Sequence, residues 1–177
     1  MCSEDMPTTL VTVKRVPPDG SCLYHAVIAC LAKRRRDGGH SVRSLRGRVA
    51  QLYEHIAQGD SGRLSTEYLS PLQYYASAEG LTVKQYISKT RKTMWGGPLE
   101  IEMLSRLLRC RIAVLNMDDL VATRANRSVY STCQATPILD FGSKRRTPLL
   151  IGIHGYQPVS GRYGAHYDAL VRVKFVR

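Results

Sequence analysis

The sequence predicts an α/β fold of the α+β type, in which a small mixed β-sheet is flanked by helices. The chain has 177 residues, 44% of them hydrophobic and 23% charged, which is typical of one globular domain. Helical periodicity is concentrated before residue 110, and the continuous apolar runs typical of buried strands come mostly after it. We expect residues 1–10 to form a flexible arm and residues 11–177 to form a single domain.

The first elements are a short strand and two helices. Alternating valines predict a strand over 11–16, which Pro17 ends. The nearly continuous apolar side of residues 22–31 predicts a buried helix that follows a polar turn. Apolar residues at steps of three and four over 42–56 predict a surface helix with one buried stripe.

Two more helices are expected before the sheet. Thr82 is a suitable N-cap for a helix over 81–92, and Pro98 can occupy the first position of a helix that ends near residue 109. Residues 59–80 have no clear pattern.

The later part of the chain supplies most of the strands. Apolar runs predict buried strands over 111–116 and 148–154, and a final strand over 167–175. The polar segment 117–147 has several turn signals and room for one short strand. The Gly- and Tyr-containing segment 155–165 is expected to be a loop.

Composition excludes several classes of protein. No apolar run approaches the ~18–20 residues of a membrane span, and the N-terminus lacks the features of a secretory signal. The cysteines are odd in number and have no CxxC spacing, which argues against a disulfide framework or a zinc site; they are Cys2, Cys22, Cys30, Cys110 and Cys133. We therefore expect a reduced, intracellular protein, cytoplasmic and possibly nuclear, with no metal, no membrane association and a monomeric state.

Cys22 is the strongest candidate for a reactive group. It lies where the turn Asp19-Gly20-Ser21 meets a helix, so the helix dipole and unpaired backbone N–H groups favour a thiolate there and predict a lowered pKa. The same N–H groups can bind the oxyanion of a tetrahedral intermediate. The alternative is that Cys22 is a small buried residue that only fills space.

His166 is the best candidate for a base to act on this thiol. It opens the final strand, and Asp168 follows two residues later on the same face, about 6–7 Å away along the backbone. A carboxylate at that spacing can orient an imidazole. His25 is expected to be a packed or capping residue, and His154 can reach such a site only if the end of its strand faces it.

Three blocks of sequence resemble the ovarian-tumour (OTU) cysteine peptidases, which remove ubiquitin from proteins. They occur in the order of that family and span nearly the whole chain. The blocks are Asp19-Gly20-Ser21-Cys22-Leu23-Tyr24, Trp95-Gly96-Gly97 with Leu99-Glu100, and His166-Tyr167-Asp168-Ala169-Leu170. Ser21 departs from the asparagine that is commonest at its position.

The resemblance implies a papain-like, OTU-type fold with Cys22 and the His166 strand on opposite sides of a cleft. It implies that Cys22 is the nucleophile, His166 the general base and Asp168 its orienting carboxylate. Asp19 matches a residue that supports the oxyanion turn or assists the histidine, although capping the turn would explain it equally well. The implied activity is cofactor-free hydrolysis of isopeptide bonds after the C-terminal Gly-Gly of ubiquitin or a ubiquitin-like modifier.

Trp95 and the basic charge of the chain each have two competing interpretations. Trp95 is interpreted as an indole packed beneath the Cys22 helix, with a position lining a substrate channel as the alternative. The net charge of +12 favours a different function, in which the fold binds nucleic acid or another partner without catalysis. The candidate contacts for that function are Lys33 to Arg36, Arg43, Arg46, Arg48 and Lys144 to Arg146.

Overall fold

The computed structural model describes residues 9–33, 39–123, 128–132, 135–154 and 166–172. The helices in this part of the chain are α1 (Cys22–Lys33), α2 (Val42–Gln58), α3 (Arg63–Ala78), α4 (Val83–Thr90), α5 (Pro98–Leu107) and the 3₁₀ helix η1 (Met117–Asp119). The strands are β1 (Leu10–Lys14), β2 (Ile112–Asn116), β3 (Val121–Ala122), β4 (Val129–Ser131), β5 (Pro137–Phe141), β6 (Leu149–His154) and β7 (His166–Arg172). The α/β fold class is confirmed.

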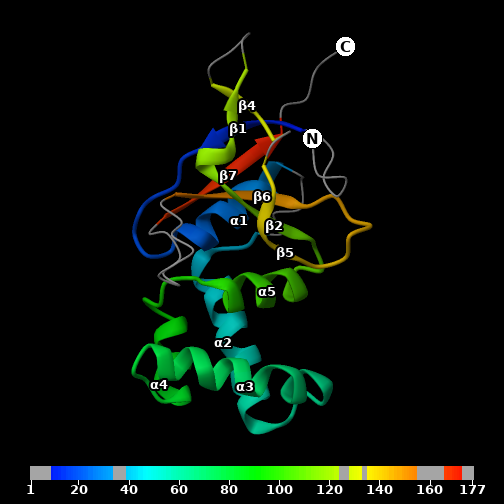
Figure 1. The fold of residues 1–177 in the computed structure, drawn as a ribbon. Helices are drawn as coiled ribbons and strands as arrows, with labels where there is room; N and C mark the ends of the chain where they lie inside the picture. The colour runs from blue at the N-terminus through cyan, green and yellow to red at the C-terminus, as the bar shows by residue number, and fades with distance from the viewer. Residues whose placement is uncertain (1–8, 34–38, 124–127, 133–134, 155–165, 173–177) are drawn as a thin grey trace.

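The described strands form one mixed sheet in the order β3-β4-β1-β7-β6-β2-β5. Strands β2 and β6 are parallel, and the other neighbouring pairs are antiparallel. The last strand, β7, therefore lies inside the sheet between the first strand, β1, and β6. Figure 1 shows this sheet in the upper half of the molecule, with α2 to α5 below it.

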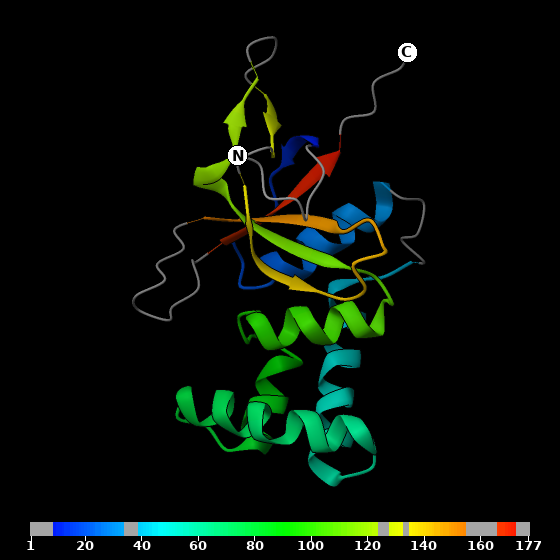
Figure 2. The ribbon, with the colours of Figure 1, turned by 45° about the vertical axis from the view of Figure 1, so that its right-hand side comes forward.

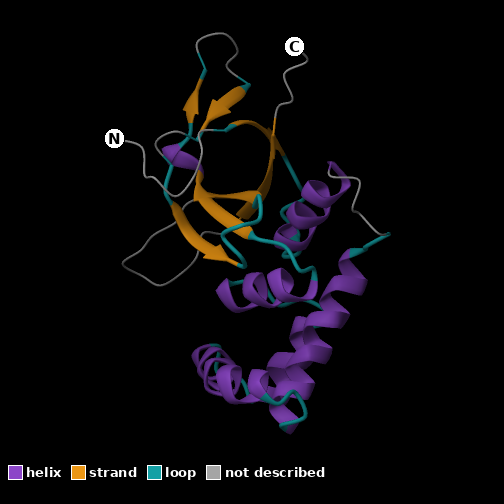
Figure 3. Cartoon of the chain, turned by 90° about the vertical axis from the view of Figure 1, so that its right-hand side faces the viewer, coloured by secondary structure: helices purple, strands orange, loops and turns teal. Residues whose placement is uncertain are grey.

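The alternation of side chains along the strands divides the core into two clusters. Ile112 and Val114 of β2 face a large cluster that includes α1, whereas Ala113 and Leu115 face a small cluster on the other side of the sheet. Helix α1 packs against β6 and β7, and α5 packs against β2 and β5. The views in Figures 2 and 3 agree that α1 and α5 lie against the sheet and that α2, α3 and α4 extend away from it.

Three of the helices α2 to α5 have well-defined ends. Ser41 caps α2 and Thr82 caps α4, each in a reciprocal capping box, and α2 ends at Gly59 in the left-handed conformation. Gly97 precedes α5, and Pro98 occupies its first turn. The caps predicted at Thr82 and Pro98 are thus confirmed.

Helix α3 was not predicted, because its sequence obscures the helical pattern. Its buried residues, Ser65, Tyr68, Leu72 and Ala76, recur at steps of three and four, but two of them are small. Pro71 lies inside the helix and is an unfavourable residue in a helix interior.

The segment 117–147 contains more structure than its polar composition indicated. It holds η1 and three strands, β3, β4 and β5, where at most one strand was expected. The residues of β3 are exposed and those of β5 are all half-buried. Strands that are not buried do not need the long apolar run that predicts the buried strands. Both form the edges of the described sheet.

Residues 9 and 10, which were expected to belong to a flexible arm over residues 1–10, have a defined structure. Leu10 already belongs to β1, and the N–H of Thr9 donates to Oγ1 of Thr132 at 3.0 Å. Residues 1–8, the basic run 34–36, the loop 155–165 and residues 173–175 lie outside the described residues. None of the described helices is long and apolar enough to cross a membrane.

Candidate active site

Cys22 is the first residue of α1, as the sequence predicted. The helix starts with a hydrogen bond from the N–H of His25 to the carbonyl oxygen of Ser21 at 3.0 Å. The Cys22 residue is only 2% exposed. The thiol therefore lies at the N-terminal end of a buried helix.

The pKa of Cys22 departs from the prediction. Burial raises the pKa of the thiol above its ordinary value, and the negative charge of Asp19 acts in the same direction. Backbone N–H groups of Tyr167, Leu23 and Cys22 itself face the sulfur and oppose the rise. A helix N-terminus alone does not ionise this thiol, because desolvation outweighs its effect. A thiol in this environment would need a base to take its proton before it could act as a nucleophile.

His166 and Asp168 lie at the start of β7, the strand that packs against the Cys22 helix. Helix α1 packs against β7, and the backbone N–H of Tyr167 lowers the pKa of Cys22, so the beginning of β7 lies near the beginning of α1. Nε2 of His166 lies 3.0 Å from Oδ1 of Asp168. Nδ1 of His166 is buried and has no hydrogen-bond partner among the described residues. A ring that donates Nε2–H to the carboxylate keeps a lone pair on Nδ1, which can accept a proton.

Asp168 is fully buried and accepts hydrogen bonds from four groups. Oδ1 accepts from the N–H of Val16 at 2.9 Å and lies beside His166, while Oδ2 lies 3.1 Å from the Arg15 guanidinium and 2.9 Å from Nε2 of His154. Burial alone would raise the pKa of Asp168, but the bonds from Val16, His154 and His166 outweigh it and hold the pKa below its ordinary value. The carboxylate is therefore a fixed negative charge.

His154 is a member of this cluster that the sequence did not single out. Strands β6 and β7 are antiparallel, and their register places His154 opposite His166, with ring centroids 5.7 Å apart. The end of β6 does face Asp168, so His154 can reach the site. Pairing the two predicted strands that flank the loop 155–165 would have identified it.

Asp19 organises the turn before Cys22. Its Oδ1 accepts from the N–H of Ser21 at 2.9 Å, and its Oδ2 lies 3.2 Å from Nε2 of His25. The N–H of Ser21 is the main cause of a lowered Asp19 pKa. These contacts match the capping interpretation of Asp19 and the expected local role of His25.

Arg46 supports the same turn from α2, where the sequence suggested a nucleic-acid contact. The residue is 2% exposed, and its guanidinium donates to the carbonyl oxygen of Gly20 at 2.8 Å and to Oγ of Ser21 at 3.1 and 3.3 Å. It also lies 4.4 Å from the centre of the Tyr24 ring. Arg46 is therefore not available as one of the candidate contacts of the nucleic-acid alternative, because the residue is buried.

The interpretation of Trp95 as an indole packed beneath α1 is wrong. The residue is 52% exposed, and its indole lies next to Gly20. Gly96 takes the position beneath the helix: a Cβ there would lie 2.9 Å from the Cβ of Leu23. The glycine allows the 95–97 segment to approach the first turn of α1.

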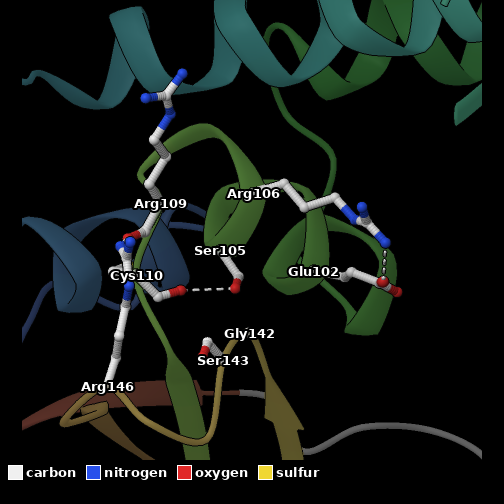
Figure 4. Close-up of a pocket in the computed structure, with 8 residues that line it drawn as sticks. All are labelled: Glu102, Ser105, Arg106, Arg109, Cys110, Gly142, Ser143 and Arg146. Atoms are coloured by element: carbon white, nitrogen blue, oxygen red, sulfur yellow. Dashed lines mark hydrogen bonds and ion pairs between the residues drawn. The ribbon is translucent and has the colours of Figure 1, made fainter.

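A pocket of about 340 Å³ lies elsewhere, between the end of α5 and the turn after β5 (Figure 4). The guanidinium groups of Arg106 and Arg109 point in different directions there, and Arg146 donates to the carbonyl oxygen of Arg109. Its lining residues, Glu102, Ser105, Arg106, Arg109, Cys110, Gly142, Ser143 and Arg146, include none of the residues around Cys22. Within the described residues, no cluster of three His, Cys, Asp or Glu side chains is arranged to bind a metal ion.

A buried thiol begins a helix that packs against the strand where a histidine lies beside a carboxylate, and thiol, histidine and carboxylate are the groups that a cysteine protease uses. Sequence comparison defines the family. A family model described as OTU-like cysteine protease matches residues 17–140, which is more than half of the chain, so the chain belongs to this family. The matched region includes Asp19 and Cys22 and ends before His166. No curated protein matches the chain.

Solved structures of OTU domains share the fold. The OTU of Hazara virus, bound to ubiquitin, is 23% identical over 96% of this chain and 88% of its own, with a TM-score of 0.54. The OTU protease of Dera Ghazi Khan virus is 18% identical over 93% and 83%, with a TM-score of 0.52. The OTU deubiquitinase of Wolbachia pipientis is 15% identical over 95% and 91%, with a TM-score of 0.53.

Proposed function

We propose that the protein is a deubiquitinase that hydrolyses the isopeptide bond after the C-terminal Gly-Gly of ubiquitin or a ubiquitin-like modifier. In this proposal Cys22 is the nucleophile, His166 the general base and acid, and Asp168 the residue that orients His166. The observation that carries it is the meeting of Cys22 with the start of β7, where Nε2 of His166 is held by Asp168 and Nδ1 has no described partner.

The reaction would proceed by acyl transfer in two steps. His166 Nδ1 accepts the proton of Cys22, and the thiolate attacks the isopeptide carbonyl to give a tetrahedral oxyanion. His166 then returns the proton to the lysine amine as it leaves, and a thioester remains on Cys22. In the second step His166 removes a proton from water, the water attacks the thioester, and the thiol and a carboxylate are released.

Ubiquitin as the substrate is supported by the family and by the burial of Cys22. The Hazara virus structure is that of an OTU bound to ubiquitin, although at 23% identity it establishes only the fold. A thiol on a residue that is 2% exposed suits a slender acyl donor, and a Gly-Gly tail has no side chains to obstruct its approach.

The test is cleavage of a panel of diubiquitins and of ubiquitin carrying a C-terminal fluorogenic amide. Wild-type protein should cleave at least one of them, and Cys22→Ala should cleave none. Cys30→Ala is the matched control, because Cys30 lies on the same helix, is 5% exposed, and donates to the carbonyl oxygen of Leu150. Folded wild-type protein that cleaves no ubiquitin substrate would refute the proposal.

The alternative is a binding module that acts through its basic surface, favoured by the net charge of +12. The buried Arg46 is not available for it, and Lys144 pairs with Asp140 at 2.5 Å, while Arg43 and Arg145 are exposed. A nucleic-acid module would lose affinity steeply with salt and keep its activity in Cys22→Ala. Replacing Lys144, Arg145 and Arg146 with Ser should change cleavage only modestly if the protein is a peptidase.

A further inference from the structure

Arg46 is a buried cation whose polar partners are all neutral. Its guanidinium donates to Ser21 Oγ and to the carbonyl oxygens of Gly20, Thr90 and Met94, the last two at 2.9 Å each. No carboxylate of the described residues forms an ion pair with it. Burying a charge without a counter-ion is costly, and extensive hydrogen bonding offsets only part of that cost.

The bonds from Arg46 hold one peptide group of the turn before Cys22. The carbonyl oxygen of Gly20 and the N–H of Ser21 belong to the same planar peptide. Arg46 donates to that oxygen at 2.8 Å, and Asp19 accepts from that N–H at 2.9 Å. The peptide is therefore fixed at both ends, and Gly20 has a positive φ of 76°, a conformation that favours glycine.

The same guanidinium connects this turn to a second segment. Its bonds to Thr90 and Met94 hold the end of α4 and the residues that lead to Trp95, which lies next to Gly20. Asp19 already engages the N–H of Ser21, so the amides of Gly20 and Cys22 are the ones that the turn can direct toward an oxyanion. The orientation of both depends on the peptide that Arg46 holds.

We propose that Arg46 is a positioning residue that fixes the Asp19-Gly20-Ser21 turn, so that the amide of Cys22 is aimed at the oxyanion of the tetrahedral intermediate. Its planar fork donates to two segments from three different nitrogens, whereas a lysine has all its donors on one nitrogen and cannot reproduce this geometry. The inference rests on the proposed acyl transfer at Cys22. Arg46 does not touch the substrate, and it acts through the turn.

The test compares two reactions of the same thiol in Arg46→Lys. Hydrolysis of ubiquitin with a C-terminal fluorogenic amide passes through an oxyanion, whereas alkylation of Cys22 by iodoacetamide does not. Loss of one oxyanion donor or a small misplacement lowers kcat by about 10²-fold or more in other enzymes, so we expect kcat to fall about 10- to 100-fold. KM and the alkylation rate, measured by peptide mass mapping, should each stay within about twofold of wild type.

Two further variants keep the test decisive. Arg111→Lys is the matched control, because Arg111 is also buried, at 4% exposed. Its guanidinium donates to Asp140, and within the described part of the chain it forms no hydrogen bond with the Asp19-Gly20-Ser21 turn. It should lower the unfolding temperature without lowering kcat. If Arg46→Lys does not fold, Ser21→Ala removes only the hydroxyl that Arg46 contacts, and it should lower kcat about 3- to 10-fold at unchanged KM.

The outcomes separate this inference from the proposed function. A kcat within twofold of wild type in folded Arg46→Lys, or in Ser21→Ala if the former does not fold, would overturn the inference alone. A parallel fall of kcat and alkylation, or an equal fall of kcat in Arg111→Lys, would also overturn it, because the effect would then be general. Wild-type protein without turnover would instead refute the deubiquitinase proposal.

Discussion

Replacing Asp168 with Asn changes the charge beside His166 while keeping the shape of the side chain. Oδ1 of the carboxylate accepts from the N–H of Val16 and lies beside Nε2 of His166. Oδ2 lies near the Arg15 guanidinium and Nε2 of His154. An Asn with its oxygen at the Oδ1 position retains the contacts with Val16 and His166. Its NH₂ group then faces the Arg15 guanidinium, which can only donate.

The expected loss is intermediate, because orientation survives and the negative charge does not. A full charge about 4 Å from an imidazolium interacts by about 4 kcal/mol at an effective dielectric constant of 20. Arg15 lies on the same carboxylate and offsets part of this effect, although its side chain is 73% exposed. We expect a net loss of roughly 1.4 to 2.8 kcal/mol of transition-state stabilisation, or a 10- to 100-fold fall in kcat/KM.

The assay is kcat/KM on ubiquitin with a C-terminal fluorogenic amide. His166→Ala should abolish turnover, and His154→Ala should be milder than His166→Ala. The double variant Arg15→Ala/Asp168→Asn should recover unfolding temperature, because it removes the donor that faces the Asn amide. The reasoning is refuted if Asp168→Asn is as inactive as His166→Ala, or fully active, while folded. His154→Ala as damaging as His166→Ala would show that the base is misassigned.

Three other predictions concern packing, the thiol and acid stability. Gly96→Ala should destabilise the fold by about 1–3 kcal/mol in chemical denaturation, since its Cβ would overlap the first turn of α1, whereas Gly97→Ala should have little effect. In His166→Ala, the alkylation rate of Cys22 should rise only above the ordinary thiol pKa of about 8.5, because burial raises the pKa; a midpoint below 8 would contradict this. Asp140→Asn should cost about 2 kcal/mol at pH 7 by losing bonds to charged partners. Burial raises the pKa of Asp140, but those partners lower it below its ordinary value, so its stabilising effect is present above about pH 4 and the difference in unfolding temperature from wild type should shrink below that pH.

The helix containing Cys22 and the strand containing His166 were predictable because each has a strong local pattern. An apolar helix follows a Gly-containing turn at Cys22, and a mostly apolar strand begins at His166. Asp168 was predictable from the two-residue period of a strand, which places it on the same face as His166.

The remaining parts of the site depend on contacts between distant segments. His154 joins Asp168 only because β6 and β7 pair in one register. The sequence alone indicates that Arg46 is an exposed cation. It is buried because α2 packs against the turn before Cys22. The raised pKa of Cys22 has the same origin, since desolvation depends on the whole core around α1. Periodicity reports the buried face of an element and does not report its partners.

The most direct test of Cys22 as the nucleophile is reaction of the protein with ubiquitin that carries a C-terminal electrophile, followed by mass mapping of the modified cysteine. We expect a single adduct on Cys22, which His166→Ala slows and Cys30→Ala does not. Modification of Cys110 or Cys133 with Cys22 untouched would contradict it.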